Sequence, residues 1–281
     1  MSLSFVGILF ALGSSALWGG TDFAGGIAAK RQRSFQVIAL AGLAGCFTFA
    51  ILGVLFDKAL PGRQNVLWAL LAGLAGAIAS ATLFKGLARG NAAIISPTSA
   101  VTGTILPVIA GFWLEGLPGN LQLAGIGLGT VGIWLVNQPD RKSGTRHWFD
   151  LGMGLLSGIF TGLFFLCFGQ IQTGSMLFAG SLSKFSSAML AIFILIGQQE
   201  RPLLGKPNWL TSGIGILDAC ANLFYLTARH LTRLDIAAVI SSMYPAGTIL
   251  LARLIQHQPI SRRQWLGVVT CLTAVALISI Q

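Results

Sequence analysis

Residues 34–56 read SFQVIALAGLAGCFTFAILGVLF, a stretch of 23 residues that contains no charged side chain. Crossing the hydrocarbon core of a bilayer as a helix takes about 20 apolar residues. Nine further segments of this kind occupy residues 4–29, 65–88, 92–114, 121–137, 151–173, 174–198, 208–228, 236–252 and 264–280. Six of the ten segments carry no charge. The sequence therefore predicts an all-α integral membrane protein with ten transmembrane helices.

The composition indicates the same class of protein. Only 9% of the residues are charged and 54% are hydrophobic, whereas soluble domains carry about 25% charged residues. The net charge is +10, but Lys and Arg lie mostly between the apolar segments, as in membrane loops, and form no polar face for nucleic acid. We expect a multi-pass protein of the cell (inner) membrane, monomeric or homodimeric, whose partner is the lipid bilayer and not a nucleic acid.

The reactive side chains are dispersed. The four cysteines lie singly in separate apolar segments, and the three histidines lie between segments. This spacing does not suit a disulfide framework or a metal site, and the chain contains no Walker motif. We expect no metal, no cofactor and no ATP hydrolysis by this chain.

A polar linker near residues 137–150 divides the chain into halves of five segments, 1–140 and 141–281. The halves echo each other: LFKGLAR (83–89) matches LFYLTAR (223–229), and ISPTSAVTGTILP (95–107) matches ISSMYPAGTILL (240–251). A unit with an odd number of spans must insert its second copy upside down. The pattern predicts two inverted five-helix repeats.

Glycines recur at helical spacing within the apolar segments. Gly154, Gly158 and Gly162 form two consecutive GxxxG steps, and Gly125 with Gly129 forms another. Such steps let two helix backbones approach closely in a membrane. We expect them to pack helices within one chain, with dimerisation as the alternative.

Five stretches carry a family resemblance: ALWGGTDF (16–23), the Ala-Arg ends of the third and eighth segments, SSMYPAGTILLARLI (241–255) and PISRRQWLG (259–267). Together they resemble the drug/metabolite transporter superfamily, in particular its ten-helix EamA-type exporters, over nearly the whole chain. Glu115 matches an acid that follows the fourth helix in that family, but Gln256-His257-Gln258 stand at the second acidic position, and Thr102 replaces a proline. The resemblance implies a central cavity, lined by helices one, three, four, six, eight and nine, that opens alternately to each side.

Four ionisable residues lie deep in apolar segments: Asp22, Lys85, Lys184 and Asp218. Such residues are costly in a membrane and usually face a cavity or a partner. From their depths along the helices we predict two ion pairs, Asp22 with Lys85 and Lys184 with Asp218. The pairs either neutralise buried charge and fix helix packing, or they handle a solute or a proton.

Polar side chains form stripes on several segments, as in Asp218, Asn222 and Tyr225 at i, i+4 and i+7. If the stripes converge, they line a binding pocket. The candidate substrate-binding residues are Trp18, Asp22, Thr98, Thr102, Asn222, Tyr225, Ser241 and Tyr244. Ordinary hydrogen bonding between helices is the alternative.

Pro97 and Pro245 occupy comparable places in the two halves. A proline removes one backbone hydrogen bond from a helix, and paired broken helices point to a transporter's binding site. We therefore predict helix breaks at both positions.

These patterns favour a secondary transporter, by resemblance an exporter, of a small organic metabolite or drug, with protons as candidate coupling ions through Asp218. The aromatic side chains suit a flat or cationic solute. A passive channel or uncoupled facilitator is the alternative. An integral membrane enzyme is less favoured, because no apolar segment contains a His and only Asp22 and Asp218 are buried acids.

Charge distribution predicts the orientation in the membrane. Loops after odd-numbered segments, with the flanking helix ends, hold 13 Lys and Arg, and loops after even-numbered segments hold four. The positive-inside rule then places both termini outside the cytoplasm, whereas the family resemblance implies both inside. We expect the first arrangement, so a cysteine introduced at position 2 should be labelled from outside and one at position 143 should not. Labelling at position 143 alone would overturn this orientation.

Overall fold

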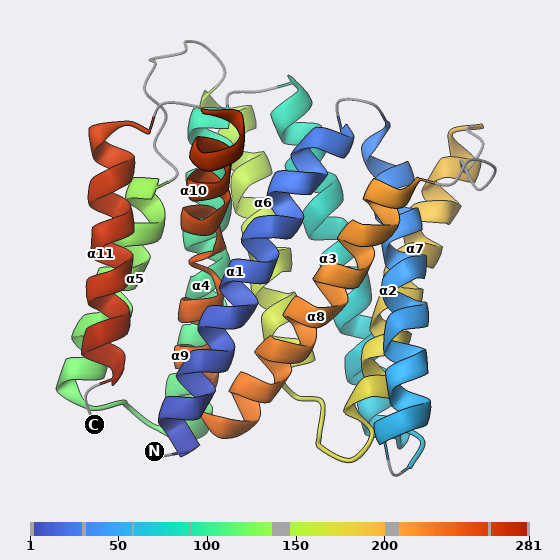
Figure 1. Ribbon diagram of the computed structural model, residues 1–281, viewed down its shortest axis with the longest axis horizontal. Coiled ribbons are helices and arrows are strands. Elements are labelled where there is room, and N and C mark those ends of the chain that lie inside the picture. The colour runs from blue at the N-terminus through green and yellow to red at the C-terminus, as the bar shows by residue number, and fades with distance from the viewer. Residues whose placement is uncertain are drawn as a thin grey trace.

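The computed structural model describes residues 3–29, 32–57, 59–89, 92–136, 147–199, 208–257 and 260–279, which form eleven helices and no strand. The helices are α1 (Leu3–Ala29), α2 (Ser34–Phe56), α3 (Arg63–Arg89), α4 (Ala92–Glu115), α5 (Asn120–Val136), α6 (His147–Phe168), α7 (Met176–Gly197), α8 (Trp209–Leu231), α9 (Leu234–Ser241), α10 (Tyr244–Gln256) and α11 (Arg262–Ser279). They stand side by side in one bundle, with both termini at the same end (Figure 1).

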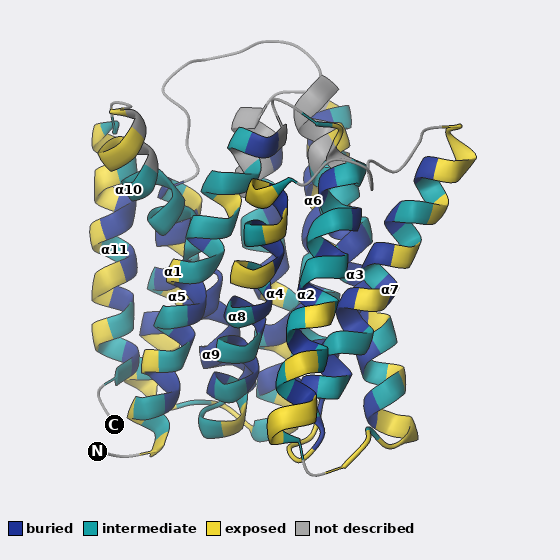
Figure 2. Cartoon of the chain, turned by 45° about the vertical axis from the view of Figure 1, so that its right-hand side comes forward, coloured by how far each residue is buried: buried dark blue, intermediate teal, exposed yellow. Residues whose placement is uncertain are grey.

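Eight segments of the described chain are long and apolar enough to cross a membrane. They are Leu3–Gly25, Phe35–Phe56, Arg63–Leu83, Thr98–Glu115, Trp148–Phe168, Met176–Gly197, Trp209–Leu231 and Leu234–Ile255, and α5 is a shorter apolar helix of 17 residues. Exposed residues lie along the outward faces of α2, α7 and α11 (Figure 2), and many of them are large and apolar, such as Val54, Phe193 and Leu272. Apolar side chains on an outer surface suit lipid, so the prediction of an all-helical, multi-pass membrane protein is confirmed.

The boundary between the sixth and seventh predicted segments differs from the sequence reading. We placed it at residues 173 and 174, but α6 ends at Phe168 and a turn fills 169–175 before α7. Gly174 has a φ of +97°, which a residue without a side chain adopts readily. The turn contains no charged residue, so the charge pattern did not mark this boundary. Its one large apolar side chain, Ile171, is fully buried.

The predicted helix 236–252 is two helices. α9 ends at Ser241, a turn occupies Ser242 and Met243, and α10 begins at Tyr244. Pro245 has no N–H for the carbonyl of Ser241, so the regular hydrogen-bond pattern cannot continue. The Met243 amide instead donates to the Ile240 carbonyl at 3.1 Å, a tighter turn. The break therefore lies just ahead of Pro245.

The first half differs at the comparable place, because α4 runs through Pro97 without interruption. A proline removes a single backbone hydrogen bond, and the remaining bonds of a helix of 24 residues keep it continuous. The structure thus contains one broken helix where the sequence predicted two.

Packing partners repeat between the two halves. α1 packs on α8 and on α9–α10, while α6 packs on α3 and on α4. In two further pairs a helix packs on its own counterpart from the other half: α2 on α7, and α5 on α11. In Figure 1, α1 runs upward from the end that carries the termini, and α6 runs downward toward it. Corresponding helices of the two halves thus have corresponding packing partners.

Glycines make the closest of these contacts, as the GxxxG spacing predicted. A Cβ added to Gly154 would lie 2.7 Å from the Thr98 Cβ on α4, and one on Gly125 would lie 2.7 Å from Ile278 on α11. No larger side chain fits at these crossings without movement of a neighbouring helix. The glycine steps therefore pack helices within the chain.

Gly158 gives the sharpest test of this packing. In Gly158→Ala the new Cβ would lie 2.5 Å from the Thr102 Cβ and 2.7 Å from the Ser99 carbonyl oxygen. We expect the free energy of unfolding to fall by about 1–3 kcal/mol, the usual effect of overpacking. Gly152→Ala on the same helix is the control, because nothing lies within 4 Å of its added Cβ. Equal melting temperatures for the two variants would contradict this account.

Candidate functional site

Asp218, in the middle of α8, gathers side chains from three helices. One carboxylate oxygen accepts a hydrogen bond from the Lys184 ammonium of α7. The other accepts from Trp18 Nε1 of α1 at 3.0 Å and from Asn222 Nδ2, one turn along α8, at 3.0 Å. The ion pair of Lys184 with Asp218 lies where the sequence reading proposed it. Its Lys184 side chain is 11% exposed and its Asp218 side chain 25% exposed.

Trp18 lies at the centre of an aromatic cluster. Its ring centroid lies 5.4 Å from that of Phe165 and 6.3 Å from that of Phe164, both on α6. The corresponding distances are 6.1 Å to Tyr225 of α8 and 6.4 Å to Tyr244 of α10. The contacts with Phe164, Phe165 and Tyr244 are edge-to-face, an arrangement that holds aromatic rings in defined orientations. The cluster therefore joins the first, sixth, eighth and tenth helices around the Asp218 carboxylate.

Three of the predicted binding residues are fully buried in this conformation. Tyr225 donates its hydroxyl proton to the Phe165 carbonyl at 2.8 Å, and Ser241 donates to the Ala11 carbonyl at 3.4 Å. Asn222, Tyr225 and Ser241 are each 0% exposed. In this conformation Tyr225 and Ser241 bind other helices, as the alternative interpretation of the polar stripes predicted, whereas Asn222 binds Asp218 on its own helix. None of the three is accessible to a solute.

The threonines of α4 lie away from Trp18. Thr98 packs against Gly154 and Thr102 against Gly158, both on α6. Both threonines keep intermediate exposure. The structure thus places the α4 stripe at the contact between α4 and α6.

Asp22 lies one turn beyond Trp18 on the same face of α1, and it is exposed. It is near enough to Asp218 and to Tyr244 to interact with them electrostatically. Tyr244 is half-buried. Of the predicted binding residues, Trp18, Asp22 and Tyr244 are therefore the ones that the structure brings together beside the Asp218 ion pair while leaving them accessible.

The predicted ion pair of Asp22 with Lys85 is absent from the described part of the chain, whose ion pairs join other residues. Lys85 is exposed on α3. α1 packs on α8, α9 and α10, whereas α3 packs on α6 and α7. The two residues share a depth in the membrane but not a neighbouring helix, and depth alone was the basis of the prediction.

Sequence reasoning missed an ionic cluster at the end of the bundle where α4 and α8 end. Arg229 Nη2 lies 2.9 Å from Glu115 Oε1, and Arg233 Nη2 lies 2.9 Å from Asp235 Oδ2. Arg233 also donates to the backbone carbonyls of Glu115 and Gly116, and Glu115 Oε2 accepts from the Leu234 amide at 3.3 Å. The sequence did contain a signal for it. The fourth and eighth segments must end at the same membrane face, which places Glu115 and Arg229 at the same end of the bundle.

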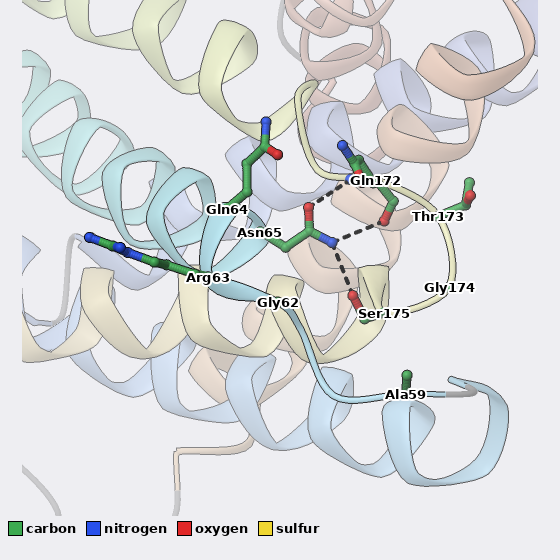
Figure 3. Close-up of a pocket in the computed structure, with 9 residues that line it drawn as sticks. All are labelled: Ala59, Gly62, Arg63, Gln64, Asn65, Gln172, Thr173, Gly174 and Ser175. Carbon is green, nitrogen blue, oxygen red and sulfur yellow. Dashed lines mark hydrogen bonds between the residues drawn. The ribbon is translucent and has the colours of Figure 1, made fainter.

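At the same end of the bundle, the turn before α3 and the turn before α7 line an open cavity of about 410 Å³. Asn65 holds the two turns together: its amide nitrogen donates to Ser175 Oγ at 3.0 Å, and its oxygen accepts from the Gln172 amide at 3.0 Å (Figure 3). Asp57 accepts from the Phe178 amide at 2.8 Å in the first turn of α7. These contacts anchor turns, and none of the residues that line the cavity belongs to the Asp218 site.

Comparison with known proteins places the chain in a family. The model of the EamA-like transporter family matches it twice, over residues 5–138 and over residues 148–280. A solved structure described only as "Crystal structure of protein" has the same fold, with a TM-score of 0.76 and 15% sequence identity over 97% of this chain and 96% of its own. No curated protein matches the chain.

The ion pair at the centre of the site can be tested through stability. Removing one partner of a buried pair leaves the other charge uncompensated. We therefore expect Asp218→Asn or Lys184→Met to lower the free energy of unfolding by about 2–4 kcal/mol. This is toward the lower end of the usual effect, because Asp218 is partly exposed. The double variant should lose less than the sum of the two. Lys85→Met is the matched control and should leave the melting temperature nearly unchanged. Strict additivity in the double variant would show that the two charges do not interact.

Proposed function

Because the chain belongs to the EamA-like transporter family, we propose that it is a secondary transporter that exports a small organic metabolite or drug by alternating access. The solute would bind beside Trp18, Asp22 and Tyr244, against the Lys184–Asp218 ion pair. A carboxylate, an ammonium and aromatic faces in the middle of an apolar bundle have an evident use in binding a polar solute.

The two ends of the bundle close around the site to different extents, and this difference is the main support for the proposal. On one side of the break before Pro245, every residue of α9 is 0–1% exposed. On the other side, the described residues of α10 near Tyr244 are half-buried, and Asp22 is exposed. A transporter halfway through its cycle has this form, with its site sealed from one face and accessible from the other.

The ionic cluster would hold the closed end. Glu115 binds Arg229 at the end of α8 and the Leu234 amide at the start of α9, so it ties three helix ends together. Arg233 adds contacts from the turn between α8 and α9 to the end of α4. Opening toward this face would require these contacts to separate, whereas opening toward the other face leaves them intact. We therefore assign the cluster the role of a gate.

The repeat architecture supports a rocking mechanism. Corresponding helices of the two halves run in opposite directions in Figure 1, and α11 lies along α5 in the same relation that joins α2 to α7. We infer ten membrane crossings, with α9 and α10 as one interrupted crossing, in two inverted repeats at 1–140 and 141–281. The two family matches stop at 138 and resume at 148, which agrees with a boundary in the linker.

Protons are the proposed coupling ions, and the cell (inner) membrane is the proposed location. Asp218 is a carboxylate at mid-depth whose partner Lys184 comes from a different helix. Relative movement of α7 and α8 would change the charge that Asp218 faces, and with it the affinity of Asp218 for a proton. This link between helix movement and protonation is what coupling to a proton gradient requires.

The two tyrosines of the chain separate a binding role from a packing role. Tyr244 is half-buried at the accessible side of Trp18, and Tyr225 is fully buried. In proteoliposomes screened with radiolabelled amino acids, sugars and cationic drugs, Tyr244→Ala should lower transport of the active compound several-fold at an almost normal melting temperature. Tyr225→Ala should instead lower the melting temperature, because it removes a large core side chain. Normal transport by folded Tyr244→Ala would remove this residue from the site, and no transport of any compound by the wild type would overturn the proposed function.

A further inference from the structure

We propose that the solute is an organic monocation, a protonated amine attached to an aromatic or otherwise flat body, and that the Asp22 carboxylate binds the amine. The inference rests on the transporter function proposed above and names its substrate class. Charge balance, an accessible acceptor and ring positions support it independently.

The charge balance of the site is negative. Asp218 and Lys184 neutralise each other in a direct ion pair. Asp22 lies near this pair, and no ion pair with another described residue neutralises it. When Asp22 is ionised, two carboxylates share one ammonium among the described residues of the site, and one negative charge has no partner. A solute that carries a single positive charge restores neutrality, whereas an anionic solute adds to the imbalance and is repelled.

The hydrogen-bonding groups lead to the same class of solute. The donors Trp18 Nε1 and Asn222 Nδ2 are both engaged with Asp218. Asp22 accepts none of the hydrogen bonds found among the described residues, and it is exposed. Its carboxylate is therefore an accessible acceptor, and a protonated amine supplies up to three N–H donors.

The aromatic rings complete the site for a cation. Trp18 and Tyr244 stand nearly perpendicular, with an interplanar angle of 73° and ring centroids 6.4 Å apart. Trp18 lies one helical turn before Asp22 on α1, and the Tyr244 ring lies beside the Trp18 ring. Two ring faces at different orientations beside one carboxylate can bind the charged end of a cation and the flat body attached to it.

Access to Asp22 does not require the ionic gate to open. Asp22 is seven residues before the end of α1, which places it about 10 Å below the end of the bundle opposite the Glu115 cluster. The residue is exposed in this conformation. A cation arriving from that end would therefore meet the Asp22 carboxylate before it reaches the ion pair beneath.

Three compounds with the same ring and different charges test the inference. Phenethylamine is protonated at neutral pH, 2-phenylethanol is neutral and 3-phenylpropionate is an anion. Calorimetric titration of the full chain in nanodiscs should give a dissociation constant for phenethylamine at least tenfold lower than for the other two. Asp22→Asn should reduce that preference to within about twofold, since it removes the charge but preserves the shape of the side chain. Asp22→Glu should retain the preference.

Three results would overturn the inference: a tenfold preference that survives in folded Asp22→Asn, tighter binding of the alcohol or the acid, or binding of none of the three by folded wild type. Counterflow in proteoliposomes separates this failure from failure of the proposed function. Transport of a neutral or anionic compound would support the transporter and reject the cation. Binding of phenethylamine without transport of any compound would leave Asp22 as a cation site and reject the transporter.

Discussion

The Asp218 carboxylate imposes the central constraint on this structure. A charge inside an apolar bundle is tolerated only when donors satisfy it, because lipid and apolar side chains offer none. Lys184, Trp18 and Asn222 supply these donors from α7, α1 and α8. Satisfying one side chain therefore fixes the relative positions of three helices. The aromatic cluster around Trp18 and the position of Asp22 follow from that arrangement.

Glycines allow the helices to pack closely enough for the donors to reach Asp218. A Cβ on Gly45 of α2 would lie 3.4 Å from the Lys184 Cγ and 3.1 Å from the Gly215 carbonyl oxygen. The absence of side chains on Gly45 and Gly215 lets α2, α7 and α8 approach closely enough for the Lys184 stem to reach Asp218. Elsewhere the glycines of α6 do the same for α4. In a membrane, where helices gain little from hydrophobic association, such close packing is a major source of stability.

The two ends of the bundle are alike in packing and unlike in chemistry. Helix pairs repeat between the halves. Arg89 is the last residue of α3, and Arg229 lies in the last turn of the corresponding helix α8. Only one end has an acid after the ninth or the fourth crossing: Glu115 follows α4, and Gln256 with His257 occupy the comparable place after α10. The ionic contacts of the Glu115 cluster therefore have no counterpart at the comparable position after α10. Equal architectures with unequal closing contacts would bias the protein toward the conformation in which the Glu115 end is closed.

The sequence by itself determined the class of fold, the approximate helix bounds and the glycine contacts, because hydrophobic length and spacing are local properties of the chain. It also identified Lys184 with Asp218, since both lie at the same depth. Depth alone could not show that the predicted ion pair of Asp22 with Lys85 is wrong. The rotation of a helix and the identity of its neighbour depend on packing between distant segments. The same limit explains why the sequence predicted Tyr225 and Ser241 as binding residues together with Tyr244. Only the tertiary structure decided which polar side chains are buried against another helix and which remain accessible, because that depends on the faces that neighbouring helices cover.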